Sequence, residues 1–241
     1  MESKETASVE SFSSRHYNKY STIPLRLDFV KELLSGHEGS RVFDPELTET
    51  VNYLSFDPLK NNQMGGSLPE VDDRIILGKK LKNFYEVVRA LDARLIYIRS
   101  GTTGHTFKGF KTTPTGTLNF GVKIVAYPKK DHYGDMHDIR RPENAEIAMI
   151  RLLSYFVVKK QTPHIILPVL AFNASIKPFA NLVKQGFIEK DDKKYGEFIA
   201  RYKKGEYCSH VSVLISEWAN SGDFLEFVRN HYAKFKPKHW K

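Results

Sequence analysis

Three short stretches rich in β-branched and aromatic residues follow one another in the middle of the chain. They read RLIYIRS, HTFKGFK and TLNFGVKIVAY, and the turn-forming sequences GTTG and TTPTG separate them. Strand-forming residues that are interrupted by such turns predict three consecutive strands. This order restricts the fold most strongly, because strands that follow one another through short turns pair side by side in one antiparallel sheet.

A long apolar helix and two more strands are predicted after these three strands. The segment RPENAEIAMIRLLSYFVVKK begins with Pro142 and Glu143, which suit a first helical turn, and it carries an apolar stripe broad enough for heavy burial. HIILPVLAFNAS and HVSVLISEW predict the fourth and fifth strands. A five-stranded antiparallel sheet with one packed helix would bury both apolar sets, so the predicted fold class is α+β.

The other segments divide the chain into three predicted parts. Residues 1–20, rich in Ser, Glu and Lys, predict a disordered tail. Residues 21–93 predict a helical N-terminal extension, with helix candidates at IPLRLDFVKELLSG, DPELTETVNYL and GKKLKNFYEVVRALDA. The sheet and its helix then occupy residues 94–241. Within them, a basic segment at 177–209 holds one helix candidate, and we interpret it as a tolerated surface insertion rather than an interaction surface.

Composition narrows the class of protein. A hydrophobic content of 41% excludes global disorder, and a net charge of +9 favours acidic partners such as nucleic acid or phosphorylated ligands, although a basic surface can also serve solubility alone. The single cysteine, Cys208, excludes an intrachain disulfide. The N-terminus lacks the apolar run of a signal peptide and no apolar run is long enough to cross a bilayer, so we expect a cytoplasmic protein without a membrane partner.

Several residues carry candidate chemistry. Glycines at 101 and 104 stand between the first two strands, where backbone without Cβ atoms can approach phosphate oxygens or simply form a structural turn. Lys123 lies inside the apolar third strand, so it either faces solvent or needs an anionic partner. Glu146 and Glu143 of the long helix are the candidate anions.

Taken in order, these elements resemble the small N-terminal lobe of the protein kinase family over about residues 94–230. IRSGTTGHTFKG resembles the glycine-rich loop, with Arg99 and Thr106 where that motif has a glycine and a valine. NFGVKIVAY resembles the Val-Ala-Ile-Lys strand, and ENAEIAMIRLLS resembles the C helix. VSVLISEWANSGDFLEFV resembles the fifth strand, the hinge and the next helix. Among kinases, the chain is most similar to the divergent members of large DNA viruses.

The resemblance implies an ATP site. Lys123 would hold the α- and β-phosphates and Glu146 would hold Lys123, and these two are the catalytic residues that this lobe supplies in the family. The glycine loop would cover the nucleotide, two hinge residues would offer backbone groups to adenine, and one residue would lie near the ribose. The expected nucleotide-binding set is Gly101, Gly104, Thr106, Lys123, Glu217, Ala219 and Asp223.

The chemistry of the family's larger lobe is not found in this sequence. Neither a His-Arg-Asp catalytic loop nor an Asp-Phe-Gly metal-binding motif follows the hinge, so we expect the chain alone to be inactive and to hold no metal. The cluster DHYGDMHD is interpreted as a loop rather than a metal site. The first hypothesis is the ATP-binding lobe of a serine/threonine protein kinase, truncated or split, which uses Mg²⁺–ATP when a larger lobe is supplied.

Two other hypotheses remain. The chain could be a non-catalytic kinase-like interaction module, which would take a protein partner in place of a separately encoded larger lobe. A basic nucleic-acid-binding protein is the third hypothesis, but only the net charge supports it, so nucleic acid is not an expected partner.

Overall fold

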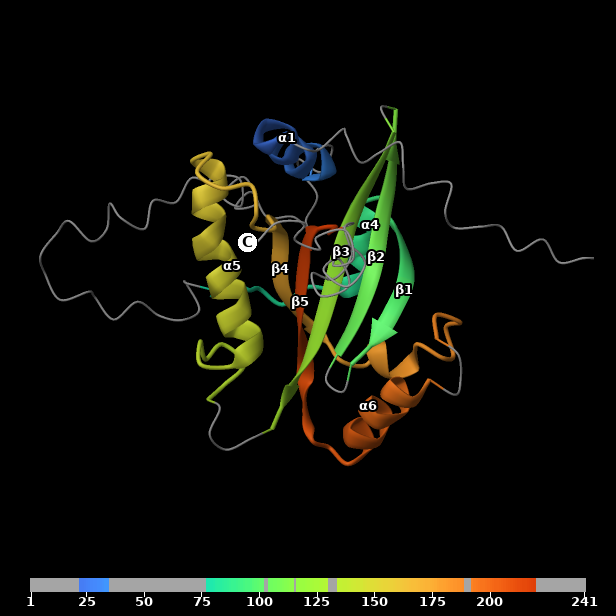
Figure 1. Cartoon of the computed structure of the whole chain (residues 1–241). Coiled ribbons are helices and arrows are strands. Elements are labelled where there is room, and N and C mark those ends of the chain that lie inside the picture. The colour runs from blue at the N-terminus through green and yellow to red at the C-terminus, as the bar shows by residue number, and fades with distance from the viewer. Residues whose placement is uncertain are drawn as a thin grey trace, which may run out of the picture.

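The computed structural model describes residues 22–34, 77–101, 104–114, 116–129, 134–188 and 192–219. These residues form one five-stranded antiparallel sheet with helices around it (Figure 1), which confirms the predicted α+β fold. The strands lie in the order β1-β2-β3-β5-β4. Their bounds are β1 (Arg94–Ser100), β2 (Gly104–Thr113), β3 (Gly116–Pro128), β4 (Pro168–Ser175) and β5 (Tyr207–Glu217).

Helices precede, interrupt and cover this sheet. The long helix predicted after the third strand is confirmed, and it begins at Pro142, a residue that suits the first turn because it needs no backbone donor there. The helix candidate at residues 44–54 lies outside the described residues. The helical elements of the described part are α1 (Ile23–Leu34), α4 (Phe84–Ala90), α5 (Pro142–Val158), the short 3-10 helix η4 (Phe179–Asn181) and α6 (Lys193–Lys203).

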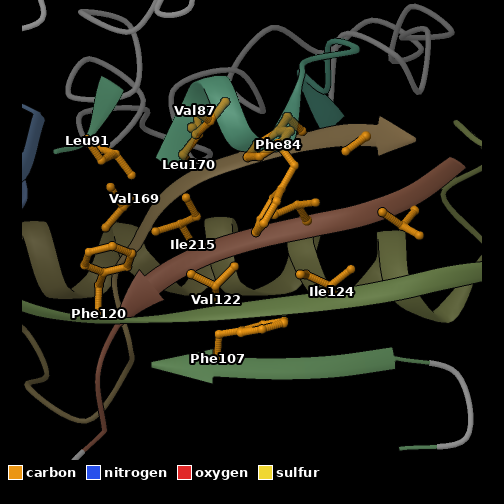
Figure 2. Close-up of a cluster of buried hydrophobic side chains, with 14 of the residues drawn as sticks. Phe84, Val87, Leu91, Phe107, Phe120, Val122, Ile124, Val169, Leu170 and Ile215 are labelled. Carbon is orange, nitrogen blue, oxygen red and sulfur yellow. The ribbon is translucent and has the colours of Figure 1, made fainter. Parts of the chain in front are cut away.

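The main hydrophobic core lies on the side of the sheet that faces away from α5. Successive side chains of a strand point to opposite sides, so β3 directs Phe120 and Ile124 to one side and Lys123 to the other. In Figure 2 the core side chains of β3 lie together with Phe84 and Val87 of α4, and the ribbon of α5 runs behind the sheet. Burial of each such side chain contributes about 1.5–3 kcal/mol.

A smaller cluster attaches α5 to the opposite side. Ile147 of α5 is buried against Ala171 of β4 and Leu214 of β5. Lys123 pairs with Leu214 across the strands, so the lysine lies at the border of this cluster. The helix is therefore held against β4 and β5. The part of α5 beside Ile147 can reach β3.

The helix α1 belongs to the same core as the sheet. Phe29, Val30 and Leu33 are buried in the cluster that also contains Phe120 of β3. Packing is thus continuous across residue 93. The division between an extension and the sheet domain at that point stays a prediction.

The helix before β1 is shorter than the sequence predicts. We expected a helix over residues 78–93, and the structure has one only from Phe84. The Asn83 side chain accepts hydrogen bonds from the backbone N–H groups of Tyr85 and Glu86, which caps the helix at this residue. The prediction was therefore wrong for residues 78–83.

Residues 80–82 pair with the edge of the sheet instead. The Lys82 N–H donates to the Asn173 C=O at 2.8 Å, and the Asn173 N–H donates to the Lys80 C=O at 2.9 Å. This is a short parallel bridge to β4 centred on Leu81. It satisfies edge groups of β4 that would otherwise be unpaired, which offsets the helical hydrogen bonds that these residues give up.

The segment between β4 and β5 also differs from its prediction. Phe179, Tyr195 and Phe198 are buried in the main core, and all three rings surround His105 of β2. The interpretation as a surface insertion is wrong for these side chains. The helix α6 is amphipathic, so it covers one end of the sheet while its lysines stay at the surface.

We expect His105 to make the fold sensitive to acid. Its ring is 2% exposed, and burial lowers its pKa from 6.5 to about 4. Between these two values the unfolded chain binds a proton more readily than the folded one. The free energy of unfolding therefore falls as the pH falls through this window, by about 3 kcal/mol. Urea unfolding at about pH 7 and about pH 4.5 measures the loss.

Two variants separate His105 from other acid-sensitive groups. His105→Leu removes the titrating ring and should reduce the loss of stability between the two pH values. His164→Leu changes an exposed histidine and should leave the loss unchanged. An equal loss in the parent and in His105→Leu would show that the buried ring is not responsible.

Candidate functional site

The side chains of Lys123 and Glu146 form an ion pair between β3 and α5. The Lys123 Nζ lies 2.6 Å from Glu146 Oε1 and 2.7 Å from Oε2. The two side chains are 48% and 37% exposed, so the pair contributes at most about 1 kcal/mol to folding. The structure thus brings together the two residues that the sequence predicts as partners. Their part in a reaction stays a prediction.

The predicted glycines lie opposite each other where β1 ends and β2 begins. The Gly101 N–H donates to the Gly104 C=O at 2.7 Å. A Cβ on Gly104 would lie 2.0 Å from the Ile124 carbonyl oxygen, so glycine is required there by the approach of β3 alone. A Cβ on Gly101 would meet only the Gly104 oxygen at 3.8 Å, so its surroundings are open. The close approach of β3 therefore explains the glycine at position 104. It does not explain the glycine at position 101.

Thr106 lies on the same side of the sheet as the ion pair. It pairs directly with Lys123 in the register of β2 and β3, and directly paired residues point to the same side. The structure therefore places Thr106 next to Lys123.

The end of β5 holds the predicted hinge residues. The Glu217 N–H donates to the Leu167 C=O at 3.0 Å, and the Glu217 C=O accepts from the Ser216 hydroxyl at 3.2 Å. Ala219 is exposed just beyond the strand. Asp223 lies outside the described residues, so the structure does not place it.

The Glu217 carboxylate is occupied by an arginine that sequence reasoning missed. Arg26 of α1 donates to Glu217 Oε1 at 2.9 Å and to Oε2 at 2.6 Å. The same guanidinium also donates to the carbonyls of Pro163 and Ile165. The only signal in the sequence was a charged residue inside an apolar helical segment, which does not identify a partner 191 residues away.

The ion pair and the end of β5 share one surface. Gly121 and Lys123 are two residues apart on β3, so they point to the same side, roughly 7 Å apart. Gly121 pairs with Ser216, and a Cβ on it would contact the Ser216 hydroxyl at 3.6 Å and the Trp218 ring at 3.7 Å. The Ser216 hydroxyl, the Glu217 carbonyl and the Trp218 ring therefore lie close to Gly121, between the end of β5 and Lys123.

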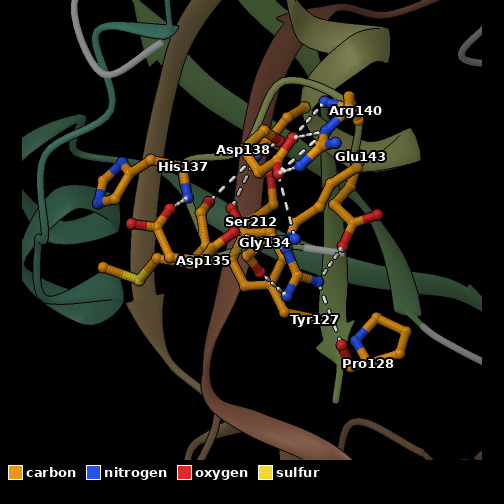
Figure 3. Close-up of polar contacts among 12 residues, drawn as sticks. Tyr127, Pro128, Gly134, Asp135, His137, Asp138, Arg140, Glu143 and Ser212 are labelled. Carbon is orange, nitrogen blue, oxygen red and sulfur yellow. Dashed lines mark hydrogen bonds and ion pairs between the residues drawn. The ribbon is translucent and has the colours of Figure 1, made fainter. Parts of the chain in front are cut away.

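The loop before α5 fixes the start of that helix (Figure 3). Asp138 accepts hydrogen bonds from the Gly134 N–H at 3.1 Å and from the Arg140 guanidinium at 2.6 Å, and this guanidinium lowers the pKa of Asp138. Arg141 is 3% exposed and donates to the carbonyls of Pro128, Gly134 and Asp135. These contacts order the loop over residues 134–141, while residues 131–133 of the cluster DHYGDMHD lie outside the described residues.

Neither a metal site nor a membrane-spanning helix is found among the described residues. In the part of the chain that the structure describes, no three His, Cys, Asp or Glu side chains gather as a metal site would require. Among the same residues, no helix has the length and apolar character needed to span a bilayer.

Comparison with curated proteins finds a protein of Acanthamoeba polyphaga mimivirus described as a "putative serine/threonine-protein kinase". It is 42% identical to this chain over 225 residues, which cover 88% of this chain and 47% of the viral protein. The chain thus spans about half the length of this relative. No family model matches the sequence, and no solved structure matches it. The match confirms the resemblance to a divergent, viral kinase-like group that the motifs predicted.

Loss of the Arg26–Glu217 contact should destabilise the fold. The two side chains are 12% and 14% exposed, and Arg26→Ala would leave the Glu217 carboxylate with its charge uncompensated. We expect the free energy of unfolding to fall by about 3 kcal/mol. Urea unfolding of the parent and the variant measures the difference.

Lys31→Ala is the matched control on the same helix. Lys31 pairs with Asp28 across one turn, and both side chains are more than half exposed. Its loss should change stability by less than about 0.5 kcal/mol. Equal effects of the two substitutions would mean that the Arg26 contact contributes no more than a surface ion pair.

Proposed function

We propose that this chain, a relative of a viral protein described as a serine/threonine-protein kinase, forms a kinase-like lobe that binds ATP. The single observation that carries the proposal is the exposed ion pair of Lys123 and Glu146, which lies on the same surface as the end of β5. A pair that adds little to folding needs another reason for its geometry. Holding an anionic ligand is such a reason.

The ammonium group of Lys123 is the proposed phosphate contact. A lysine has three N–H donors, and two of them point to the two oxygens of Glu146. The third can donate to a phosphate oxygen. Glu146 would then orient the lysine, and the half-exposed position would let the ligand approach from solvent.

The adenine base of ATP would lie between the sheet and the hinge at the end of β5. The Glu217 C=O and the Ala219 N–H are the proposed contacts of adenine. Gly101 and Gly104 would place their turn above the phosphates, with Thr106 beside Lys123. Asp223 is proposed near the ribose on the resemblance alone.

Binding and orientation are the roles that we assign to this chain. A bound Mg²⁺ would neutralise phosphate charge, but the described residues contain no group of ligands suited to it. The viral relative is about twice as long, and we propose that phosphoryl transfer depends on a second lobe of that kind.

Mg²⁺–ATP should raise the midpoint of thermal unfolding. A ligand at about 100 times its Kd stabilises the folded state by about 2.7 kcal/mol. For a chain of this size, each kcal/mol raises the midpoint by about 2–4 °C, so a rise of about 5–10 °C is expected. Lys123→Ala should abolish the rise and leave the midpoint without nucleotide nearly unchanged, because the ion pair is exposed.

Lys111→Ala is the control, since Lys111 lies on the same sheet and its position on β2 directs it away from Lys123. It should keep the full rise. Equal protection of the parent and Lys123→Ala would remove Lys123 from the phosphate site. No rise in the parent would contradict ATP binding and favour the kinase-like interaction module.

A further inference from the structure

A buried lysine ties α5 to the sheet from a segment before the predicted domain. Lys79 is 5% exposed, and its Nζ donates three hydrogen bonds. The acceptors are the Tyr127 hydroxyl of β3 at 2.8 Å, the Asn144 Oδ1 of α5 at 2.6 Å and the Ser212 hydroxyl of β5 at 2.6 Å. All three donors of the ammonium are therefore used, one on each of three elements.

The backbone on both sides of Lys79 is anchored as well. On one side, residues 80–82 pair with Asn173 at the edge of the sheet. On the other side, the Arg151 guanidinium of α5 donates to the Leu77 carbonyl. Gly78 between them has a φ of +53°, and a Cβ there would lie 3.2 Å from the Arg151 guanidinium. This segment, residues 77–82, is hereafter called the strap.

The strap holds α5 at two points that flank Glu146. Asn144 and Arg151 are two helical turns apart, and Glu146 lies between them along the helix. A rotation or shift of α5 by a fraction of a turn would break the bonds to Lys79. It would also carry the Glu146 carboxylate away from Lys123, because an exposed ion pair is too weak to hold the helix by itself.

We propose that Lys79 is a positioning residue, which holds α5 against the sheet so that Glu146 reaches Lys123. The inference rests on the ATP-binding function proposed above. Lys79 touches neither Lys123 nor any atom assigned to the nucleotide. Lys79 acts by holding α5 in place. Its three buried hydrogen-bond acceptors fix the position of its ammonium group.

The charge of Lys79 gives this role a specific signature. Burial lowers its pKa from 10.5 to about 7, against the opposing effect of the nearby Glu143. The ammonium donates three hydrogen bonds and the neutral amine donates two. The attachment of Lys79 to α5 and the sheet therefore weakens as the pH rises through about 7. The other charged or titratable groups that face Lys79 are Glu146 and Arg151 on α5 and Tyr127 on β3.

The test compares Lys79→Met with the parent by hydrogen exchange and by ATP affinity. Methionine keeps a long apolar side chain and removes the donors. In nucleotide-free protein, amides of α5 should exchange about tenfold faster, while those in the centre of β3 keep their protection. In the same preparations, affinity for Mg²⁺–ATP should fall about tenfold. Lys193→Met, an exposed lysine of α6, should match the parent in both measurements.

The pH dependence separates positioning from a general loss of packing. The parent should bind ATP more tightly than Lys79→Met below about pH 7, and this advantage should shrink above it. The nucleotide is the same in both measurements, so the difference between the two proteins reports the loss of Lys79. A difference that does not change with pH would overturn the positioning role.

Exchange in α5 at the parental rate would overturn the proposal directly. If Lys79→Met loses protection everywhere, Ser212→Ala replaces it, since it removes one acceptor and should speed α5 exchange about threefold. Parental exchange in that variant would also overturn the proposal. If the parent does not bind ATP, the proposed function fails, and the exchange of α5 still decides whether the strap holds the helix.

Discussion

The alternation of side chains along β3 is the constraint on which the rest of the structure depends. A strand directs successive residues to opposite sides, so one strand can supply Phe120 and Ile124 to the main core and Lys123 to the other surface. The core side is filled by α4, η4 and α6. Among the described residues, α5 and the segment around Lys79 pack on the lysine side, and Lys123 itself stays half exposed. The candidate site exists because the fold buries one side of its sheet more completely than the other.

Ionic contacts in this protein differ in what they contribute. The Lys123–Glu146 pair is exposed and adds little to stability, so its loss is compatible with folding. The Arg26–Glu217 pair is mostly buried, and the Lys79 ammonium is almost completely enclosed. Charges in such positions persist only when hydrogen bonds replace the water that they lose. The buried contacts therefore define geometry, and the exposed pair is the one proposed to hold a ligand.

Two of the enclosed cations come from the segment ahead of the sheet. Arg26 reaches the end of β5 from α1, and Lys79 reaches α5 from the strap. Arg26 holds the hinge side of the proposed nucleotide site, and Lys79 holds the helix that carries Glu146. The segment ahead of the sheet is thus more than an addition to it. Its contacts hold the two elements between which a nucleotide would bind.

The sequence by itself determined the strands, the helix α5 and the pairing of Lys123 with Glu146. Those features depend on local patterns, namely alternation, helical periodicity and the spacing of a known motif. Only the tertiary structure decided that residues 78–83 are not helical, that Phe179 and its neighbours enter the core, and that Arg26 and Lys79 are mostly enclosed. Each of these depends on partners far away in the sequence. A local preference for helix or for solvent is worth less than about 1 kcal/mol per residue, so distant hydrogen bonds and packing override it.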